Sequence, residues 1–149
     1  MAYSPFAFNP ESTGSAEALV TPYTNASAIN PIPQAMACSV NSSGQLVPLD
    51  VSNQASFQAF VGYANVRIGT SASGPIIANG RLQNFTTSYT AGTPLYIGTD
   101  GNPTNIIPSA GVNGFVSGDA CIFMGVVVVN ETNPSEFDIA LFTQVVGEL

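Results

Sequence analysis

Residues 90–108, TAGTPLYIGTDGNPTNIIP, decide the fold, because they predict a strand, a tight turn and a returning strand. The run LYI at 95–97 consists of good strand formers. The Asp100-Gly101 dipeptide that follows is a strong short-range hairpin signal. Two prolines in the second half of the stretch limit how far the returning strand can pair. The stretch therefore predicts a β-hairpin, and no catalytic chemistry is visible in it.

The rest of the chain from residue 34 onward has the same β texture. Short apolar runs alternate with turns rich in Gly, Asn and Ser, and no convincing helix is present beyond short turns. Further strands are predicted at residues 36–40, 45–49, 57–68, 75–78, 81–86, 119–130 and 136–146. Short strands at even spacing predict an all-β body, either a single compact β-barrel or a β-tulip-like sandwich.

Two of these segments carry more specific expectations. Asn79-Gly80 is a candidate type I′ turn between the short runs on either side of it. The run CIFMGVVVV at 121–129 is the most apolar in the chain. Because its apolar residues are continuous rather than alternating, it predicts a strand buried on both faces.

The two halves of the chain resemble each other. The hairpin at 36–49 leads to VGYANV at 61–66, and the hairpin at 95–107 leads to MGVVVV at 124–129. This repetition suggests two similar β units packed into one body, with Gly62 and Gly125 at equivalent bends.

Residues 1–33 differ from the body at 34–149 and are predicted to form an extended proline-rich arm. They contain five prolines, which fix φ and remove backbone donors. Tyr3, Phe6 and Phe8 are unusual there, because disordered tails are poor in aromatic residues. Either they fold back onto this chain's own core, or they anchor the arm on a neighbouring subunit. The enrichment of aromatic residues at interfaces favours the second alternative.

The composition narrows the choice of partners. Charged residues make up 7% of the chain, where about 25% is usual, and the net charge is −7. Two arginines cannot neutralise the phosphates of a nucleic acid or attract an anionic membrane. No apolar run reaches the roughly 20 residues of a membrane helix, and we expect no signal peptide because the start lacks a basic region. The shortage of charge favours a chain that packs against others over one that its net charge keeps apart.

Catalytic and metal-binding patterns are also missing. Without histidine there is no usual base for a nucleophilic triad and no histidine metal site, and no phosphate-binding glycine motif is present. Cys38 and Cys121 lack metal-ligand spacing, so we expect two buried free thiols. The segment 100–102 lacks the full calcium-loop spacing and is interpreted as a plain turn. We therefore expect no enzyme, no cofactor and no metal.

Glu136 and Asp138 are the nearest pair of acids. Alternate residues share one face of a strand, so the two carboxylates could lie together. A glycosidase requires acids on both sides of a sugar cleft, but Asp and Glu side chains are mostly exposed. We expect two solvated residues on an outward face.

The hairpin phrases also carry a resemblance. AGTPLYIGTDGNPTN at 91–105, followed by MGVVV at 124–128, together with SGQLVPLD at 43–50 and FVGYANV at 60–66, resembles the small capsid decoration (cement) and head-fibre proteins of tailed bacteriophages. This resemblance covers roughly residues 36–146. The arm matches no motif of that group residue by residue.

The resemblance implies a β-barrel or β-tulip body without enzymatic activity. It implies a virion protein, made in the host cytoplasm, that binds the outer lattice of the major capsid protein and stabilises the head, often as a homotrimer with an arm reaching across capsomers. Tyr3, Phe6 and Phe8 are then the candidate arm contacts. The alternative is a head-fibre or tail-fibre module that binds host-surface glycans through the loops at 69–74 and 109–118.

Overall fold

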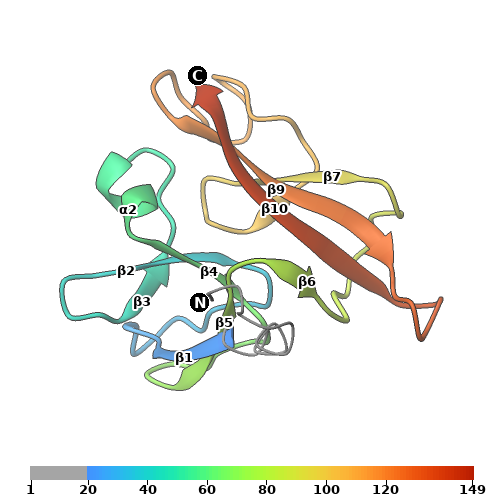
Figure 1. Ribbon diagram of the computed structural model, residues 1–149. Coiled ribbons are helices and arrows are strands. Elements are labelled where there is room, and N and C mark those ends of the chain that lie inside the picture. Colours follow the sequence, from blue (N-terminus) through green and yellow to red (C-terminus); the bar gives the residue numbers. More distant parts are fainter. Residues whose placement is uncertain (1–19) are drawn as a thin grey trace, which may run out of the picture.

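The computed structural model describes residues 20–149, which form two five-stranded antiparallel sheets (Figure 1). The first sheet has the order β1 (Val20–Thr24), β5 (Ser73–Ile77), β4 (Phe60–Ala64), β2 (Ala37–Val40) and β3 (Leu46–Pro48). The second has the order β6 (Gly80–Leu82), β10 (Phe137–Glu148), β9 (Ala120–Val129), β7 (Pro94–Ile97) and β8 (Pro103–Thr104). The all-β prediction is confirmed; the arrangement is a two-sheet sandwich, and the barrel is not closed.

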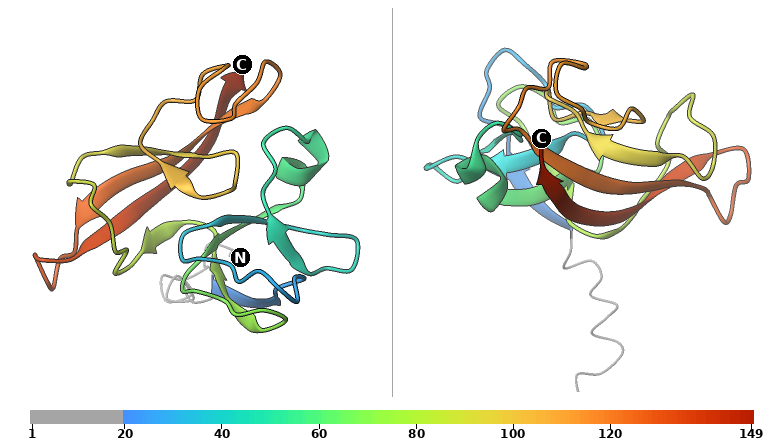
Figure 2. Two further views of the ribbon diagram at one scale, coloured as in Figure 1. Left: turned by 180° about the vertical axis from the view of Figure 1, so that it is seen from behind. Right: turned by 90° about the horizontal axis from the view of Figure 1, so that it is seen from above.

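The two sheets repeat one topology. Strands β1 to β5 and β6 to β10 follow the same spatial order, so each strand of the first unit (residues 20–77) has a counterpart in the second (residues 80–148). In both units a short hairpin lies at one edge and the last strand lies beside the first. The internal repeat predicted from the sequence is therefore present in the fold, as two sheets in sequence order (Figure 2).

The strand glycines lie at equivalent bulges. Gly62 of β4 is opposite Cys38, Gly125 of β9 is opposite Leu95, and the register shifts directly after each pair. A Cβ atom at Gly62, where φ is 142°, would lie 2.6 Å from the carbonyl oxygen of Ile77. A Cβ atom at Gly125 would overlap the equivalent carbonyl oxygen of the neighbouring strand. Both bends require glycine because another backbone passes too close for a side chain.

The hairpin turns are equivalent as well. Between β2 and β3 the amide of Asn41 donates to the carbonyl of Gln45 at 2.9 Å, and between β7 and β8 the amide of Gly98 donates to Asn102 at 2.8 Å. Gly101 has a φ of 87°, which a side chain would strain. Its carbonyl accepts a bond from the amide of Ala37 at 2.8 Å. The predicted Asp-Gly turn is confirmed, and it also joins the two sheets.

The units pack with unlike faces together. The first sheet contributes Ala37, Tyr63 and Ile77 to a core shared with the second sheet. The second sheet contributes residues from the face that is not equivalent to this one, including Leu95, Val127 and Ile139. Their first-unit counterparts, Cys38, Ala64 and Ile76, instead form a separate core on the far side of the first sheet. The Tyr63 hydroxyl lies 2.6 Å from Thr143 Oγ1, which links β4 to β10.

Two strand predictions are wrong. The flanks of Asn79-Gly80 do not form a hairpin, because β5 and β6 belong to different sheets and the chain crosses between them here. The predicted strand at 57–68 is shorter, because helix α2 (Gln54–Gln58) precedes β4. Asn53 caps this helix by accepting a bond from the amide of Ala55 at 3.0 Å.

The first strand lies within the segment predicted as an arm. β1 pairs with β5 along its whole length, and Ile32 is buried in the first unit. Residues 20–33 therefore pack as part of the body. The remaining arm residues, with Tyr3, Phe6 and Phe8, lie outside the described residues.

Candidate interaction surface

Strand β9 is apolar on both sides but is buried along most of its length on only one of them. Ile122, Met124 and Val127 are buried, as predicted. On the opposite side Phe123, Val126 and Val128 are only half-buried, whereas Cys121 is 8% exposed. The prediction of burial on both faces therefore holds at Cys121 and is wrong from Phe123 onward, because the first sheet covers only the inner face of the second. The uncovered side is called the outer face below.

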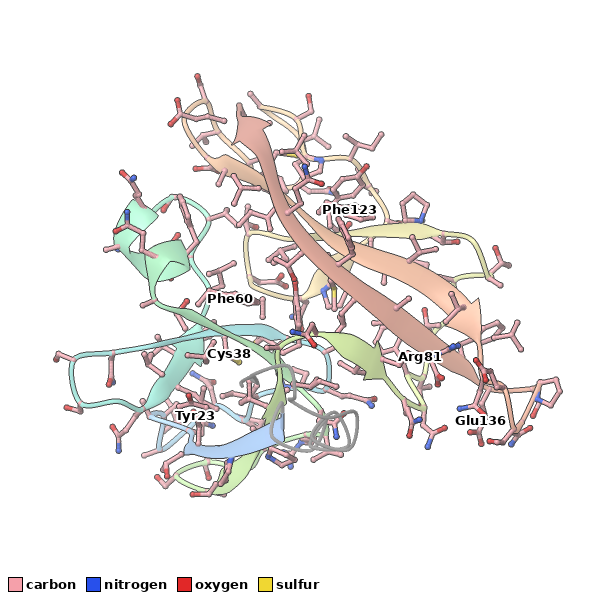
Figure 3. The ribbon with its side chains drawn as sticks, in the orientation of Figure 1. Tyr23, Cys38, Phe60, Arg81, Phe123 and Glu136 are labelled. Atoms are coloured by element: carbon pink, nitrogen blue, oxygen red, sulfur yellow. The ribbon has the colours of Figure 1, made fainter. Side chains whose placement is uncertain are left out.

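The outer face matches the face with which the first sheet docks. Pro94, Val126 and Ala140 lie side by side on it, at the positions that Ala37, Tyr63 and Ile77 occupy in the first unit. Both faces carry a T-shaped aromatic pair, Tyr96 with Phe123 at 5.7 Å and Phe60 with Tyr63 at 5.3 Å between ring centroids. Figure 3 shows Phe123 on the second unit and Phe60 on the first. The second unit thus repeats the face with which the first sheet docks, and Tyr96, Phe123 and Val126 on it are only half-buried.

The last part of β10 has an open edge. β6 pairs with β10 only from Ile139 to Leu141, and beyond that point only β9 pairs with it among the described strands. Phe142 is 68%, Val145 53% and Val146 61% exposed. Sheet edges are usually protected by Lys, Pro or charge, and between Phe142 and Glu148 only the terminal glutamate offers such protection. This edge is therefore available to another segment of backbone.

A groove runs between this edge and helix α2, which face each other in Figure 1. Its volume is about 430 Å³. The lining residues are Val51, Ser52, Gln54, Phe57, Gly118, Ala120, Val145, Gly147 and Glu148. A bond of 2.9 Å from the amide of Ala120 to the carbonyl of Val51 closes the groove floor between the units. Apart from Glu148 the lining carries no charge.

Exposed apolar side chains concentrate in the second unit. Of the ten large apolar residues exposed in the described chain, two belong to the first unit, namely Ile29 and Val66. The other eight are Ile106, Ile107, Val112, Val116, Val129, Phe142, Val145 and Val146. Large exposed apolar patches mark interaction sites, so the second unit is the candidate binding side of the molecule.

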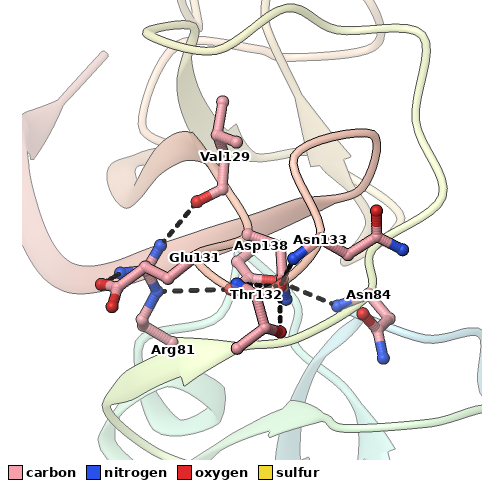
Figure 4. A network of polar contacts seen from close by, with 8 residues as sticks. Arg81, Asn84, Val129, Glu131, Thr132, Asn133 and Asp138 are labelled. Atoms are coloured by element: carbon pink, nitrogen blue, oxygen red, sulfur yellow. Dashed lines mark hydrogen bonds and ion pairs between the residues drawn. The ribbon is translucent and has the colours of Figure 1, made fainter.

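One arginine and two acids form a charge network at one end of the outer face (Figure 4). Arg81 pairs with Glu131 at 2.9 Å and with Asp138 at 3.3 Å. The second contact is an ion pair rather than a hydrogen bond, since Arg81 Nε has no hydrogen-bond partner. Asp138 accepts bonds from Asn130 Nδ2 at 3.0 Å and from the amide of Asn84 at 3.1 Å.

This network corrects the prediction for the acidic pair. Asp138 is only 2% exposed, whereas Glu136 is exposed as predicted. Asp138 is buried because Arg81 on the neighbouring strand compensates its charge. The two carboxylates are thus in different environments and do not form a joint site.

Other polar candidates have structural roles. Cys38 and Cys121 are free and buried, and burial raises the pKa of the Cys38 thiol to about 12 and also raises the pKa of Cys121. Asp100 Oδ1 accepts a bond from the amide of Asn102 at 3.0 Å, as expected of a plain turn. Within residues 20–149 no group of three or more His, Cys, Asp or Glu could hold a metal ion, and no helix is long and apolar enough to cross a membrane.

The surface that remains is the outer face together with the open edge of β10. Sequence reasoning had singled out Tyr3, Phe6 and Phe8 instead, which the described residues do not include. Comparisons of the chain with protein-family models, with curated proteins and with solved structures find no match.

Proposed function

We propose that this chain is a structural virion protein that decorates the outer surface of a major capsid lattice and stabilises the head. The observation that carries the proposal is the second unit, which exposes eight of the ten large apolar side chains exposed in the described residues. A protein that worked as a free monomer would gain nothing from this surface, because exposed apolar area favours association. The resemblance of the hairpin segments to phage decoration proteins suggests that the partner is a major capsid protein.

The mechanism of such a protein is passive. It bridges neighbouring capsid subunits and thereby opposes rupture of the shell. A stable contact of this kind buries about 1,200–2,000 Å². Because the protein binds the intact lattice and not its separated parts, binding shifts the equilibrium toward the intact shell by mass action.

The composition supports the same proposal. A low proportion of charged side chains is characteristic of the cores of interfaces, and charged residues make up 7% of this chain. Assembly as a homotrimer and contact through Tyr3, Phe6 and Phe8 stay predictions. The chain has no catalytic part in this proposal.

Counting the copies of this protein per virion by quantitative mass spectrometry tests the proposal. Hundreds of copies support a shell component, whereas about a dozen support the alternative of a head-fibre or tail-fibre module. Antibody labelling in electron microscopy locates the copies. Labelling confined to one vertex or to the tail would overturn the proposal.

Variants test which surface binds. We expect Phe142→Asp to abolish co-sedimentation of the purified chain with heads that lack it, because a charge then faces the partner. Val66→Asp is the matched control, since Val66 is also exposed, at 49%, but lies on the first unit. Equal binding by both variants would show that the outer face is not the surface that binds the capsid.

A further inference from the structure

The groove between α2 and β10 is suited to one kind of occupant. The edge of β10 offers unpaired backbone groups from Phe142 onward, and these are satisfied by an extended segment added as a further strand. Val51, Phe57 and Val145 in the lining offer apolar contacts to large side chains on that segment. The groove volume of about 430 Å³ lies within the roughly 300–1,000 Å³ of sites that hold such groups.

The chain itself supplies such a segment close by. Val20, where the described structure begins, is paired with Ile77. Gly80 follows Ile77 by three residues and is paired with Leu141, the last residue before the open edge of β10. With paired Cα atoms about 5 Å apart and about 3.3 Å per residue, Val20 lies within roughly 20 Å of Leu141.

The residues before Val20 are long enough to reach the whole groove. Phe8 precedes Val20 by a stretch that spans up to roughly 40 Å when extended. A tethered segment of this length acts at an effective concentration of the order of millimolar. The segment of the same chain is therefore favoured over the same segment of a second copy at micromolar concentration.

The chemistry of this segment matches the groove. Residues 1–10 contain no charged side chain, so they bring no repulsion toward Glu148 at the rim. Phe6 and Phe8 are two residues apart and share one face of an extended strand. Pro5 is compatible with the first position of a strand, and Pro10 ends the pairing.

We propose that residues 6–9 of this chain dock as an additional strand on the edge of β10, with Phe6 and Phe8 in the groove beside Phe57. The proposal takes the fold-back alternative for Phe6 and Phe8 and replaces their predicted capsid contact. The outer face, and not the edge of β10, then remains for a partner. The proposal does not depend on capsid binding, and it closes an edge that would otherwise promote aggregation.

Disulfide trapping in the full chain tests the proposal. The double variant Phe6→Cys with Val145→Cys is oxidised mildly at low micromolar concentration, while the native thiols remain buried. We expect a disulfide within one chain, formed at a rate independent of protein concentration and detected by mass spectrometry. Phe6→Cys with Val66→Cys is the matched control, since Val66 is about equally exposed but does not line the groove.

Two results would overturn the proposal. One is a trapping rate in the double variant no higher than in the control. The other is a disulfide that appears only between chains when the two single variants are mixed, which assigns the groove to a second copy.

Hydrogen exchange provides an independent readout without new cysteines. We expect the amides of residues 145–148 to exchange at least ten times faster in Phe6→Ser/Phe8→Ser than in the wild-type chain, because the added strand is lost. Equal exchange rates in the two proteins would show that residues 6–9 do not pair with this edge.

Discussion

The two units of this molecule share one topology but differ in what they leave exposed. Both have the same strand order, the same bulge and the same turn. The first unit buries both faces of its sheet, one against the second unit and one in a core of its own. The second unit buries one face fully and leaves much of the other half-buried or exposed. Since the framework is common to both, the difference in exposure is the better guide to function.

The difference arises from what surrounds each sheet. In the first unit the segments around Ile32 and Ile68 form a bridge over the second face and cover it. The second unit instead has longer central strands, with 10 residues in β9 and 12 in β10, against 5 in each of their counterparts. The added length extends past the first sheet and creates the open edge.

Replacing the bulge glycines tests the equivalence of the units and should have the largest effect on the free energy of unfolding. We expect Gly62→Ala and Gly125→Ala each to lower the free energy of unfolding by about 2–4 kcal/mol, because a methyl group meets a neighbouring carbonyl oxygen. Urea unfolding measures the change. Gly44→Ala is the control; its φ of 75° costs only roughly 1–2 kcal/mol, since nothing lies within 4 Å. If either Gly62→Ala or Gly125→Ala left the free energy of unfolding unchanged, the two bulges would not be equivalent.

Removing the charge of Asp138 tests a feature that only the second unit has. The counterpart of Asp138 in the first unit is Pro75, which has no network. We expect Asp138→Asn to cost about 2 kcal/mol, because Arg81 and Asn130 lose a charged acceptor. Glu131→Gln, at an 80% exposed side chain, should change unfolding by less than about 0.5 kcal/mol. Similar losses for both variants in urea unfolding would contradict this interpretation.

Raising the pH probes the core found only in the first unit. The Cys38 thiol has a pKa of 9.0 when unfolded and about 12 when folded. The folded chain keeps a proton that the unfolded chain loses, so stability is unaffected below pH 9 and falls as the pH rises from 9 toward 12. Each pH unit in that window costs about 1.4 kcal/mol, so the loss at pH 10 is about 1.4 kcal/mol.

Unfolding in urea at pH 8 and pH 10 measures this dependence. In Cys38→Ala the loss between the two pH values should be smaller by about 1.4 kcal/mol. Cys121→Ala is the matched variant in the second unit and should keep most of the wild-type dependence. An unchanged pH dependence in Cys38→Ala would mean that this thiol is not the group responsible.

Polar substitutions on the exposed apolar residues should have the smallest effect on folding. Phe142→Ser and Val66→Ser are each expected to change the free energy of unfolding by no more than about 0.5 kcal/mol. They should differ in binding of a hydrophobic dye, which we expect to fall only in Phe142→Ser, because Phe142 is 68% exposed and lies in one strand with exposed Val145 and Val146. A destabilisation above 1 kcal/mol would mean that Phe142 packs within its own chain.

The parts of the fold that depend on local chemistry could be predicted from the sequence. The Asp100-Gly101 turn, the apolar strand at 121–129 and the repeated glycines each reflect neighbouring residues or a repeated pattern. Asn79-Gly80 was misinterpreted because a turn signal does not say whether the flanking strands pair. Gly80 does adopt a positive φ of 95°, yet β5 and β6 lie in separate sheets.

The candidate site could be predicted less well, since it depends on tertiary packing. The continuous apolar run in β9 indicated two buried faces, but nothing local shows that one face would lack a cover. The burial of Asp138 depends on Arg81, far away in sequence. One signal was available in the last strand, where Phe142, Val145 and Val146 break the alternation that buries Ile139 and Leu141.

The packing of unlike faces gives the molecule a direction. Two sheets related by a twofold axis would present the same surface at both ends. Here the two sheets face the same way, so the two ends of the molecule differ. At one end, segments of the first unit cover the far face of the first sheet. At the other end, the outer face of the second sheet repeats the face with which the first sheet docks. On the proposed capsid lattice, a module with two different ends would bind in one orientation, and every copy would turn the same side outward.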